Sequence, residues 1–271
     1  MKSVLVPIED HTSMSAVLET ARQAAMALSA NLCAIPLRAM QFQVVGAEPI
    51  VAVSFPPADQ DDEDASAKAR SIYDAFVARH GESAAKAAWL EIPPVDDIGL
   101  GSLARVYDMT VLGRPSSNDA GARMTTLEAV LFDSGRPVLI APSQPSGPIG
   151  KNIVISWNRS TEAARTLSFA MPLLKTAEKI TVLTLDEAVV PGPLGSEVCR
   201  YLRDNDIASD ELTVSAGGRR PGAAILQEAT RLECDLLIKS AYTQSRLRQM
   251  IFGGATSHIL AHAEIPVFMA N

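Results

Sequence analysis

Residues 235–271 read DLLIKSAYTQSRLRQMIFGGATSHILAHAEIPVFMAN, and residues 108–141 read DMTVLGRPSSNDAGARMTTLEAVLFDSGRPVLIA. Each passage consists of an Asp, a short apolar run, a turn of small residues, a helical stretch and a last apolar run that begins near a proline. The apolar runs are nearly continuous, which is typical of parallel strands covered on both faces. The repeat therefore predicts two copies of one α/β unit.

A second pair of matching passages exists, and each member lies upstream of one member of the first pair. Residues 3–8 (SVLVPI) are expected to form a strand, residues 15–30 a helix with one apolar face, and residues 31–37 another strand. The same order of elements returns downstream, at residues 152–157, 161–176 and 179–185. Strand–helix–strand units of this length imply a parallel sheet with right-handed crossovers.

Two matching pairs with similar separations indicate a duplicated domain. We expect residues 1–145 and residues 151–271 to be the two copies. The segment PSQPSGPIGK at 142–151 is rich in Pro, Ser and Gly, which is typical of an extended linker.

The copies differ in their middle sections. The first copy has a polar interruption at 55–67, which contains the acidic run 59–64 and precedes a predicted helix at 67–80. We expect a solvated loop and helix entry there, where carboxylates suit the helix dipole, and a cation site is the alternative. The second copy has a shorter bridge at 186–195 and a predicted helix at 196–205.

Composition excludes several classes of protein. The net charge of −7 argues against a nucleic-acid partner, because phosphate neutralisation needs a basic surface. No uncharged apolar run approaches the roughly 18 residues that cross a bilayer, so no membrane partner is predicted. Acidic residues follow the first strand before a signal-peptide core can form, and we expect a cytoplasmic protein. The three scattered cysteines are expected to fill cores: Cys33, Cys199 and Cys234.

These motifs together resemble the universal stress protein family. The resemblance rests on VLVPIEDHT at the first strand, on DLLIKSAY before the second turn, and on the closing runs GRPVLIAP and EIPVFMAN. Its most specific part is SRLRQMIFGGATSHILAHAEIPVF. The resemblance implies the tandem form of the family: two copies of an open sheet of five parallel strands with helices on both faces, packed about a pseudo-twofold axis. It also implies a role in stress response, as a sensor or an interaction module.

ATP-binding members of that family carry Gly-x2-Gly-x9-Gly-Ser/Thr after the fourth strand, where backbone N–H groups approach phosphate oxygens without a Cβ in the way. In the second copy this spacing is kept by Ser240, Thr243 and Gly253, followed by Gly254 and Thr256. Two glycines are therefore replaced, and the new side chains either crowd a phosphate chain or offer hydroxyls to it. The resemblance favours a small anionic ligand here, ATP or another adenine nucleotide, and a loop inherited only as a turn is the alternative.

Two further features stand near this predicted site. Asn158 occupies the position where ATP-binding members place an acidic residue that meets the adenine, and an amide still hydrogen-bonds a base edge. The sequence GGRRPG at 217–222 leads into a predicted helix at 223–232. Its arginines, Arg219 and Arg220, are either an anion site or a solvated turn.

The first copy is predicted not to bind ATP. Gly113 matches the first glycine of the motif, but Pro115, which lacks an N–H, follows where a flexible loop is expected. Met124 and its neighbours then replace the third glycine, although Glu9 keeps an acidic group at the end of the first strand. We expect this copy to be a packing partner or to hold a different small ligand.

Other groups of residues give weaker indications of function. His258 and His262 share a face of a predicted helix, but they lack an acidic partner, so no metal site is predicted. No catalytic motif is present, and catalysis is the weaker hypothesis. The alternatives to a ligand-binding sensor are a ligand-free protein-interaction module with both sites vestigial and a slow ATP hydrolase. We expect the two copies to pair within one chain; the protein partner and a homodimer are left open.

Overall fold

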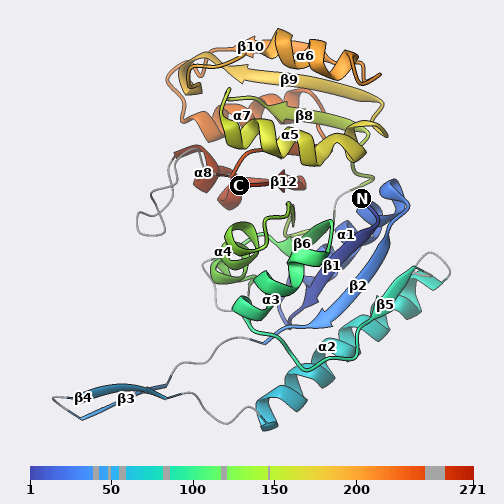
Figure 1. Ribbon diagram of the computed structural model, residues 1–271, viewed down its shortest axis with the longest axis vertical. Helices are drawn as coiled ribbons and strands as arrows, with labels where there is room; N and C mark the ends of the chain where they lie inside the picture. The colour runs from blue at the N-terminus through green and yellow to red at the C-terminus, as the bar shows by residue number, and fades with distance from the viewer. Residues whose placement is uncertain are drawn as a thin grey trace.

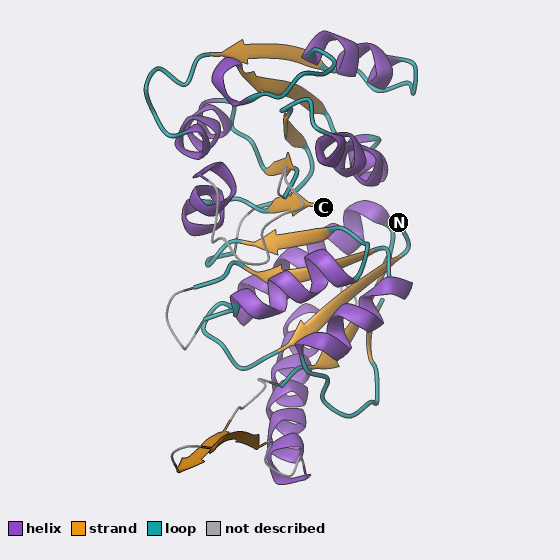
Figure 2. Ribbon diagram, turned by 60° about the vertical axis from the view of Figure 1, so that its left-hand side comes forward, coloured by secondary structure: helices purple, strands orange, loops and turns teal. Residues whose placement is uncertain are grey.

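One sheet of ten strands runs through the whole molecule. The computed structural model describes residues 1–38, 43–47, 50–54, 59–81, 86–116, 121–145, 147–241 and 254–271. Among these residues the strand order is β10-β9-β8-β11-β12-β7-β6-β1-β2-β5, and helices cover both faces (Figures 1 and 2). The predicted α/β fold class is therefore confirmed.

Each half of the chain, residues 1–145 and residues 151–271, contributes five neighbouring strands. The first half supplies β1 (Ser3–Ile8), β2 (Asn31–Pro36), β5 (Ala87–Trp89), β6 (Met109–Gly113) and β7 (Val138–Ala141). The second half supplies β8 (Asn152–Ser156), β9 (Lys179–Leu185), β10 (Asp210–Val214), β11 (Leu236–Lys239) and β12 (Val267–Met269). Within each half the strands lie in the order third, second, first, fourth, fifth, and all neighbours are parallel. The two five-stranded sheets thus have one topology.

The halves meet through their last strands. β7 and β12 pair antiparallel, with Leu139 opposite Phe268 at the centre of the register. Leu139 and Phe268 are fully buried. This pairing places the two halves head to head in one sheet, as expected for an approximate twofold relation.

Helices form one layer on each face of the sheet, because the side chains of a strand alternate between its faces. In β1, Val4 and Val6 belong to one hydrophobic core, and Leu5 belongs to the other. The first core packs against α1 (Met14–Leu28), α2 (Asp59–His80), α5 (Thr161–Leu174) and α6 (Gly195–Arg203). The second packs against α3 (Asp97–Leu103), α4 (Met124–Asp133), α7 (Pro221–Arg231) and α8 (Gly254–His262). Short 3-10 turns occur at Ala104–Val106 and Asp186–Ala188.

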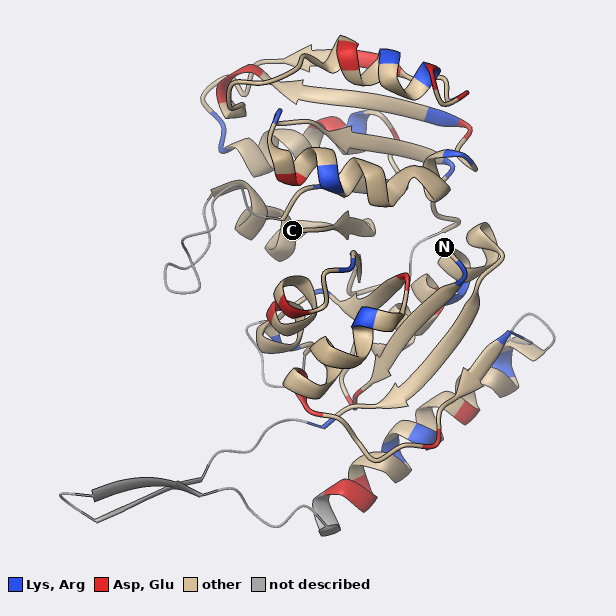
Figure 3. Ribbon diagram, viewed as in Figure 1, with Lys and Arg blue, Asp and Glu red and all other residues tan. Residues whose placement is uncertain are grey.

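The distribution of charge follows these layers. Figure 3 shows charged residues mainly on helices and loops, whereas the strands are largely uncharged. None of the helices in the described ranges is both long and apolar enough to span a bilayer.

The Asp that opens each repeated passage ties two strands together. Asp108 accepts hydrogen bonds through Oδ2 from the N–H groups of Lys2 and Ser3, at 2.5 and 3.0 Å. Asp235 accepts three such bonds, each of 2.9 Å, from the backbone of residues 150–152. Each carboxylate thereby fixes the start of the neighbouring first strand of its half.

The structure corrects one prediction and adds elements that the sequence analysis did not place, among them β5 and α3. The acidic run 59–64 is not a loop, because α2 begins at Asp59 and places the run in its first turns, where carboxylates interact favourably with the helix dipole. Asp62 forms an ion pair with Arg38 at 2.9 Å. Another added element is a hairpin of β3 (Gln43–Ala47) and β4 (Ile50–Ser54), which pair with each other and not with the large sheet.

Candidate functional site

The candidate site lies at the carboxyl end of β11, beside β8. Strand order reverses between these two strands, and such switch points are where open α/β sheets bind ligands. Lys239 is the last residue of β11 and stands opposite Ser156, the last residue of β8. The predicted loop residues follow directly after Lys239.

Lys239 is a buried cation with neutral partners. Its side chain is almost fully buried, at 7% relative exposure. Its Nζ donates hydrogen bonds to the backbone oxygen of Ser240 at 2.7 Å and to Oγ1 of Thr256 at 2.9 Å. Burial lowers the pKa of the Lys239 ammonium from its usual 10.5 to about 8. The sequence analysis did not single out this residue.

Two of the predicted ligand-binding residues contact this ammonium, and a third, Gly254, begins the helix that contains one of them. Ser240 and Thr256 are buried and both contact Nζ, as described above. The Thr256 hydroxyl also donates to the backbone oxygen of Ala241 at 2.5 Å, so it joins the end of β11 to the first turn of α8. Gly254 begins α8, and no heavy atom of the described residues packed against it lies within 4 Å of the place a Cβ would occupy. Thr243 and Gly253 lie outside the described residues.

Asn158 stands after β8 and is engaged locally. Its Oδ1 accepts a hydrogen bond from the N–H of Ser160 at 3.2 Å, which is an Asx turn leading into α5. Ser160 is the N-cap of α5 and accepts a hydrogen bond from Ala163. The backbone oxygen of Asn158 accepts a hydrogen bond from the N–H of Val190 at 3.1 Å. The structure thus places Asn158 at the end of the correct strand but gives it no contact with Lys239 or Thr256 among the described residues.

In the GGRRPG turn, Arg219 hydrogen-bonds to residues close to it in sequence. Arg219 donates through Nε to the backbone oxygen of Ala216 at 2.7 Å and also contacts Gln227, which supports the turn interpretation for this arginine. Arg220 is exposed at the start of α7. A Cβ at Gly222 would lie 2.6 Å from the backbone oxygen of Ala255. Glycine at this position therefore lets α7 approach the first turn of α8.

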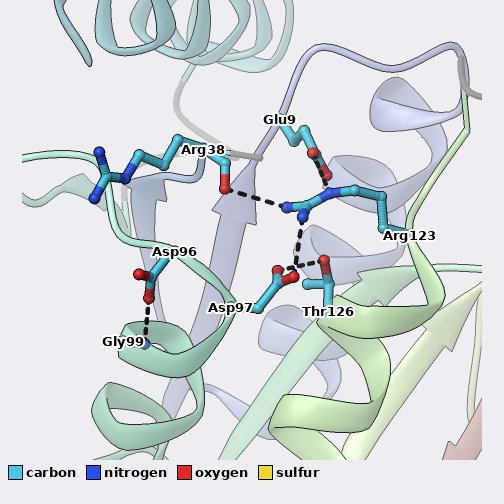
Figure 4. A network of polar contacts seen from close by, with 7 residues as sticks. All are labelled: Glu9, Arg38, Asp96, Asp97, Gly99, Arg123 and Thr126. Atoms are coloured by element: carbon cyan, nitrogen blue, oxygen red, sulfur yellow. Dashed lines mark hydrogen bonds and ion pairs between the residues drawn. The ribbon is translucent and has the colours of Figure 1, made fainter. Parts of the chain in front are cut away.

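The equivalent place in the first half holds a network of ion pairs (Figure 4). Arg123, just before α4, donates through Nε to Glu9 at 2.7 Å and through Nη1 to Asp97 at 2.9 Å. Its Nη2 reaches the backbone oxygen of Arg38 at 3.3 Å. Thr126 donates to the second oxygen of Asp97 at 2.8 Å. The carboxylate of Glu9, which the sequence analysis placed at the end of the first strand, therefore has its counter-charge within the chain.

This network leaves little space. The cavity beside Glu9, His11 and Arg123 measures about 10 Å³, which is about the size of a single water probe. Burial raises the pKa of Glu9, and the charge of Arg123 opposes that rise in part. A Cβ at Gly113 would lie 2.8 Å from the Cβ of Ala122, so this glycine serves close packing of the turn.

The register of the two sheets aligns Lys239 with a leucine. Leu112 lies two residues after Thr110, which pairs with Val138; Lys239 lies two residues after Leu237, which pairs with Val267. In the helices, the buried pair Val130–Leu131 of α4 corresponds to Ile259–Leu260 of α8, so Leu127 corresponds to Thr256. Leu112 and Leu127 are buried in one core. The apolar pair of the first half is therefore a Lys–Thr pair in the second.

The two histidines of α8 stack on each other. The ring centroids of His258 and His262 are 4.2 Å apart, and Nδ1 of His262 lies 2.9 Å from the backbone oxygen of His258. No group of three His, Cys, Asp or Glu side chains that would suit a metal ion occurs within the ranges that the structure describes.

These observations define a doubly wound α/β protein with a candidate ligand site at the switch point of its second half. Residues 150–271 match the model of the universal stress protein family. This part of the chain therefore belongs to that family. None of the curated proteins compared with the chain matches it.

Solved structures extend the likeness of fold to the whole chain. A universal stress protein from Archaeoglobus fulgidus is 15% identical, with 99% of this chain and 98% of that chain covered and a TM-score of 0.73. A putative universal stress protein from Pseudomonas aeruginosa is 14% identical, with coverage of 100% and 93% and a TM-score of 0.59. The cytoplasmic domain of a prokaryotic cation chloride cotransporter is 14% identical, with coverage of 99% and 94% and a TM-score of 0.52. The predicted fold is thus confirmed over the whole chain, and the predicted family is confirmed for residues 150–271.

Proposed function

We propose that this protein is a stress-response sensor or interaction protein that binds a small anionic ligand, foremost an adenine nucleotide, in its second half. The observation that carries the proposal is the contact of Ser240 and Thr256 with Lys239 at the switch point between β8 and β11, beside Gly254, where a Cβ would meet no heavy atom of the described residues packed against it. The family of the second half supports the stress-response role.

Binding would use backbone donors on both sides of the site. The first N–H groups of α8, from Gly254 to Thr256, have no partner within their own helix, and the positive end of the helix dipole favours an anion there. The segment from Ser240 to Thr243, together with Gly253, would complete the phosphate site. Asn158 would meet the base, because its Nδ2 makes no hydrogen bond to another described residue.

The first half takes a structural role in this proposal. Arg123 occupies the region beside Glu9 and leaves a cavity of about 10 Å³, which does not admit a nucleotide. The antiparallel pairing of β7 with β12 makes the first half the packing partner of the ligand-binding half.

A ligand-free interaction module is the second candidate, and one observation favours it. The Thr256 hydroxyl and the Asn158 carbonyl already have partners inside the protein, so part of the site is satisfied without a ligand.

Calorimetric titration and thermal shift with ATP, ADP, AMP and cyclic nucleotides test the proposal. We expect at least one nucleotide to bind, and Gly254→Val to weaken it by about tenfold because the new side chain enters the open space. Gly147→Val is the matched control, since a Cβ there also meets no heavy atom within 4 Å and the residue lies in the linker.

The absence of any response at millimolar nucleotide would contradict the nucleotide version and favour the interaction module. The slow hydrolase is tested in the same samples, by phosphate release from ATP. Release that Gly253→Val abolishes, with no release from a mock purification, would support the hydrolase instead.

A further inference from the structure

The buried Lys239 ammonium lacks a compensating charge. Both of its hydrogen-bond partners, the Ser240 carbonyl and the Thr256 hydroxyl, are neutral. Among the described residues, no carboxylate lies within ion-pair distance of Nζ. An ammonium has three donors, so one hydrogen remains without a partner in the described part of the chain. A buried charge without a counter-ion is costly to the folded state.

The fold does not need a cation at this position. In the first half, the same register position holds Leu112, which packs in the core with Leu127. Leu112 shows that this one register position can be filled by an apolar side chain. Lys239 and Thr256 therefore replace a favourable contact with a costly one, and packing gives no reason for the exchange.

The amino end of α8 adds a partial positive charge beside the Lys239 ammonium. Thr256, which accepts from Nζ, lies in the first turn of α8. The amino end of a helix carries a partial positive charge, and its first N–H groups lack partners within the helix. An ammonium beside a helix amino end is unfavourable unless an anion lies between them.

We propose that the Lys239 ammonium is the group that holds the phosphoryl end of the ligand, together with the first N–H groups of α8. In this site a side-chain cation adds to the backbone donors of α8, in a loop whose sequence has Ser240 and Thr243 in place of two of the motif's glycines. The proposal rests on the proposed function, since both concern the same site. It adds that recognition of the anion is electrostatic and depends on one residue.

The affinity for the anion should depend on pH because the Lys239 amine is buried. Burial alone lowers the pKa of Lys239 to about 8. Charged or titratable side chains on the packed elements are Glu162 and Arg165 of α5 and His258 and His262 of α8, and none of them is a cause of this shift. A bound anion stabilises the ammonium and raises its pKa, so binding takes up a proton above about pH 8. Affinity should then fall by about tenfold for each pH unit above about 8, until the pKa of the complex is reached.

Titrations with ATP, inorganic pyrophosphate and adenosine test the assignment. We expect Lys239→Leu to weaken ATP and pyrophosphate on the order of 10- to 100-fold, the worth of a hydrogen bond to a charged group, and to leave adenosine unchanged. A second variant, Lys239→Leu with Thr256→Leu, rebuilds the apolar pair of the first half and guards against a misfolded single variant. Lys179→Leu, which removes an exposed lysine at the start of β9, is the matched control.

The outcomes separate the two proposals. If ATP binds the wild type and the Lys239 variants equally, the role of Lys239 is wrong and the proposed function stands. If wild-type affinity for ATP, whose phosphates are already fully ionised, stays constant from pH 7.5 to 9.5, backbone donors hold the anion and the assignment is overturned, whether or not the variants fold. If the wild type binds none of the three probes, both proposals fail.

Discussion

The two halves of this protein differ in how they neutralise a cation near the carboxyl ends of their strands. In the first half, Arg123 lies between two carboxylates, Glu9 and Asp97, so its charge is balanced within the chain. In the second half, Lys239 meets only neutral oxygens among the described residues. Strand order and register are the same in both, so the fold imposes neither arrangement. A site that balances its own charge has no use for an anion, whereas one that does not can gain from binding one.

The largest expected effect concerns the cost of the unbalanced charge. Because the pKa of Lys239 falls from 10.5 unfolded to about 8 folded, the penalty is fully present below pH 8. As pH rises from 8 to 10.5, the folded state loses its proton first, and the free energy of unfolding should rise by about 3 kcal/mol. Urea denaturation of the ligand-free wild type and of Lys239→Leu across this range measures the effect. The variant should lack the rise. If the free energies of unfolding of the two proteins change with pH in parallel, burial of the ammonium does not destabilise the folded state.

A smaller effect is expected from the balanced charge. Arg123→Leu leaves Glu9 and Asp97 facing each other without their cation, and should lower the free energy of unfolding by about 2 kcal/mol. This is below the range for fully buried pairs because the Arg123 side chain is 23% exposed. Arg231→Leu removes an exposed arginine from its pair with Glu228 and should cost at most about 0.5 kcal/mol. Equal losses in the two variants would mean that the first-half network is only a surface contact.

The smallest effect tests the symmetry itself. Asp108→Ala and Asp235→Ala each remove the carboxylate that fixes the start of a first strand, and each should cost about 1–2 kcal/mol. The loss is moderate because the freed N–H groups lie near the surface and can meet water. Denaturant unfolding compares the two variants directly. A difference between them well above 1 kcal/mol would show that the halves are less alike in their scaffolds than in their strand order.

Local patterns predicted much of the fold. β1 and β9 were predicted with the bounds that they have in the structure, because an apolar run between polar turns marks a strand covered on both faces. The hairpin of β3 and β4 was missed, since it forms no part of the large sheet whose repeat guided the prediction. The start of α2 was placed too late because a run of carboxylates was taken for a loop, although such a run also suits a helix amino end.

The charged groups of the two sites were harder to predict. Arg123 is bound by Glu9 and Asp97, which are distant in sequence, so no local pattern joins the three residues. Lys239 did leave a signal. It ends an apolar run of a predicted two-sided strand, and aligning the repeats places it opposite Leu112. What the sequence does not supply is the burial of its amine, which depends on where α8 packs.

The antiparallel pairing of β7 with β12 has a consequence for how the two sites can diverge. In a symmetric dimer of identical chains, every substitution appears in both subunits, so closing one site closes the other. Covalent linkage removes that constraint, and it also makes the contact between the halves independent of protein concentration. One half is then free to lose a ligand while the other changes the way it holds one, with the shared sheet unaltered.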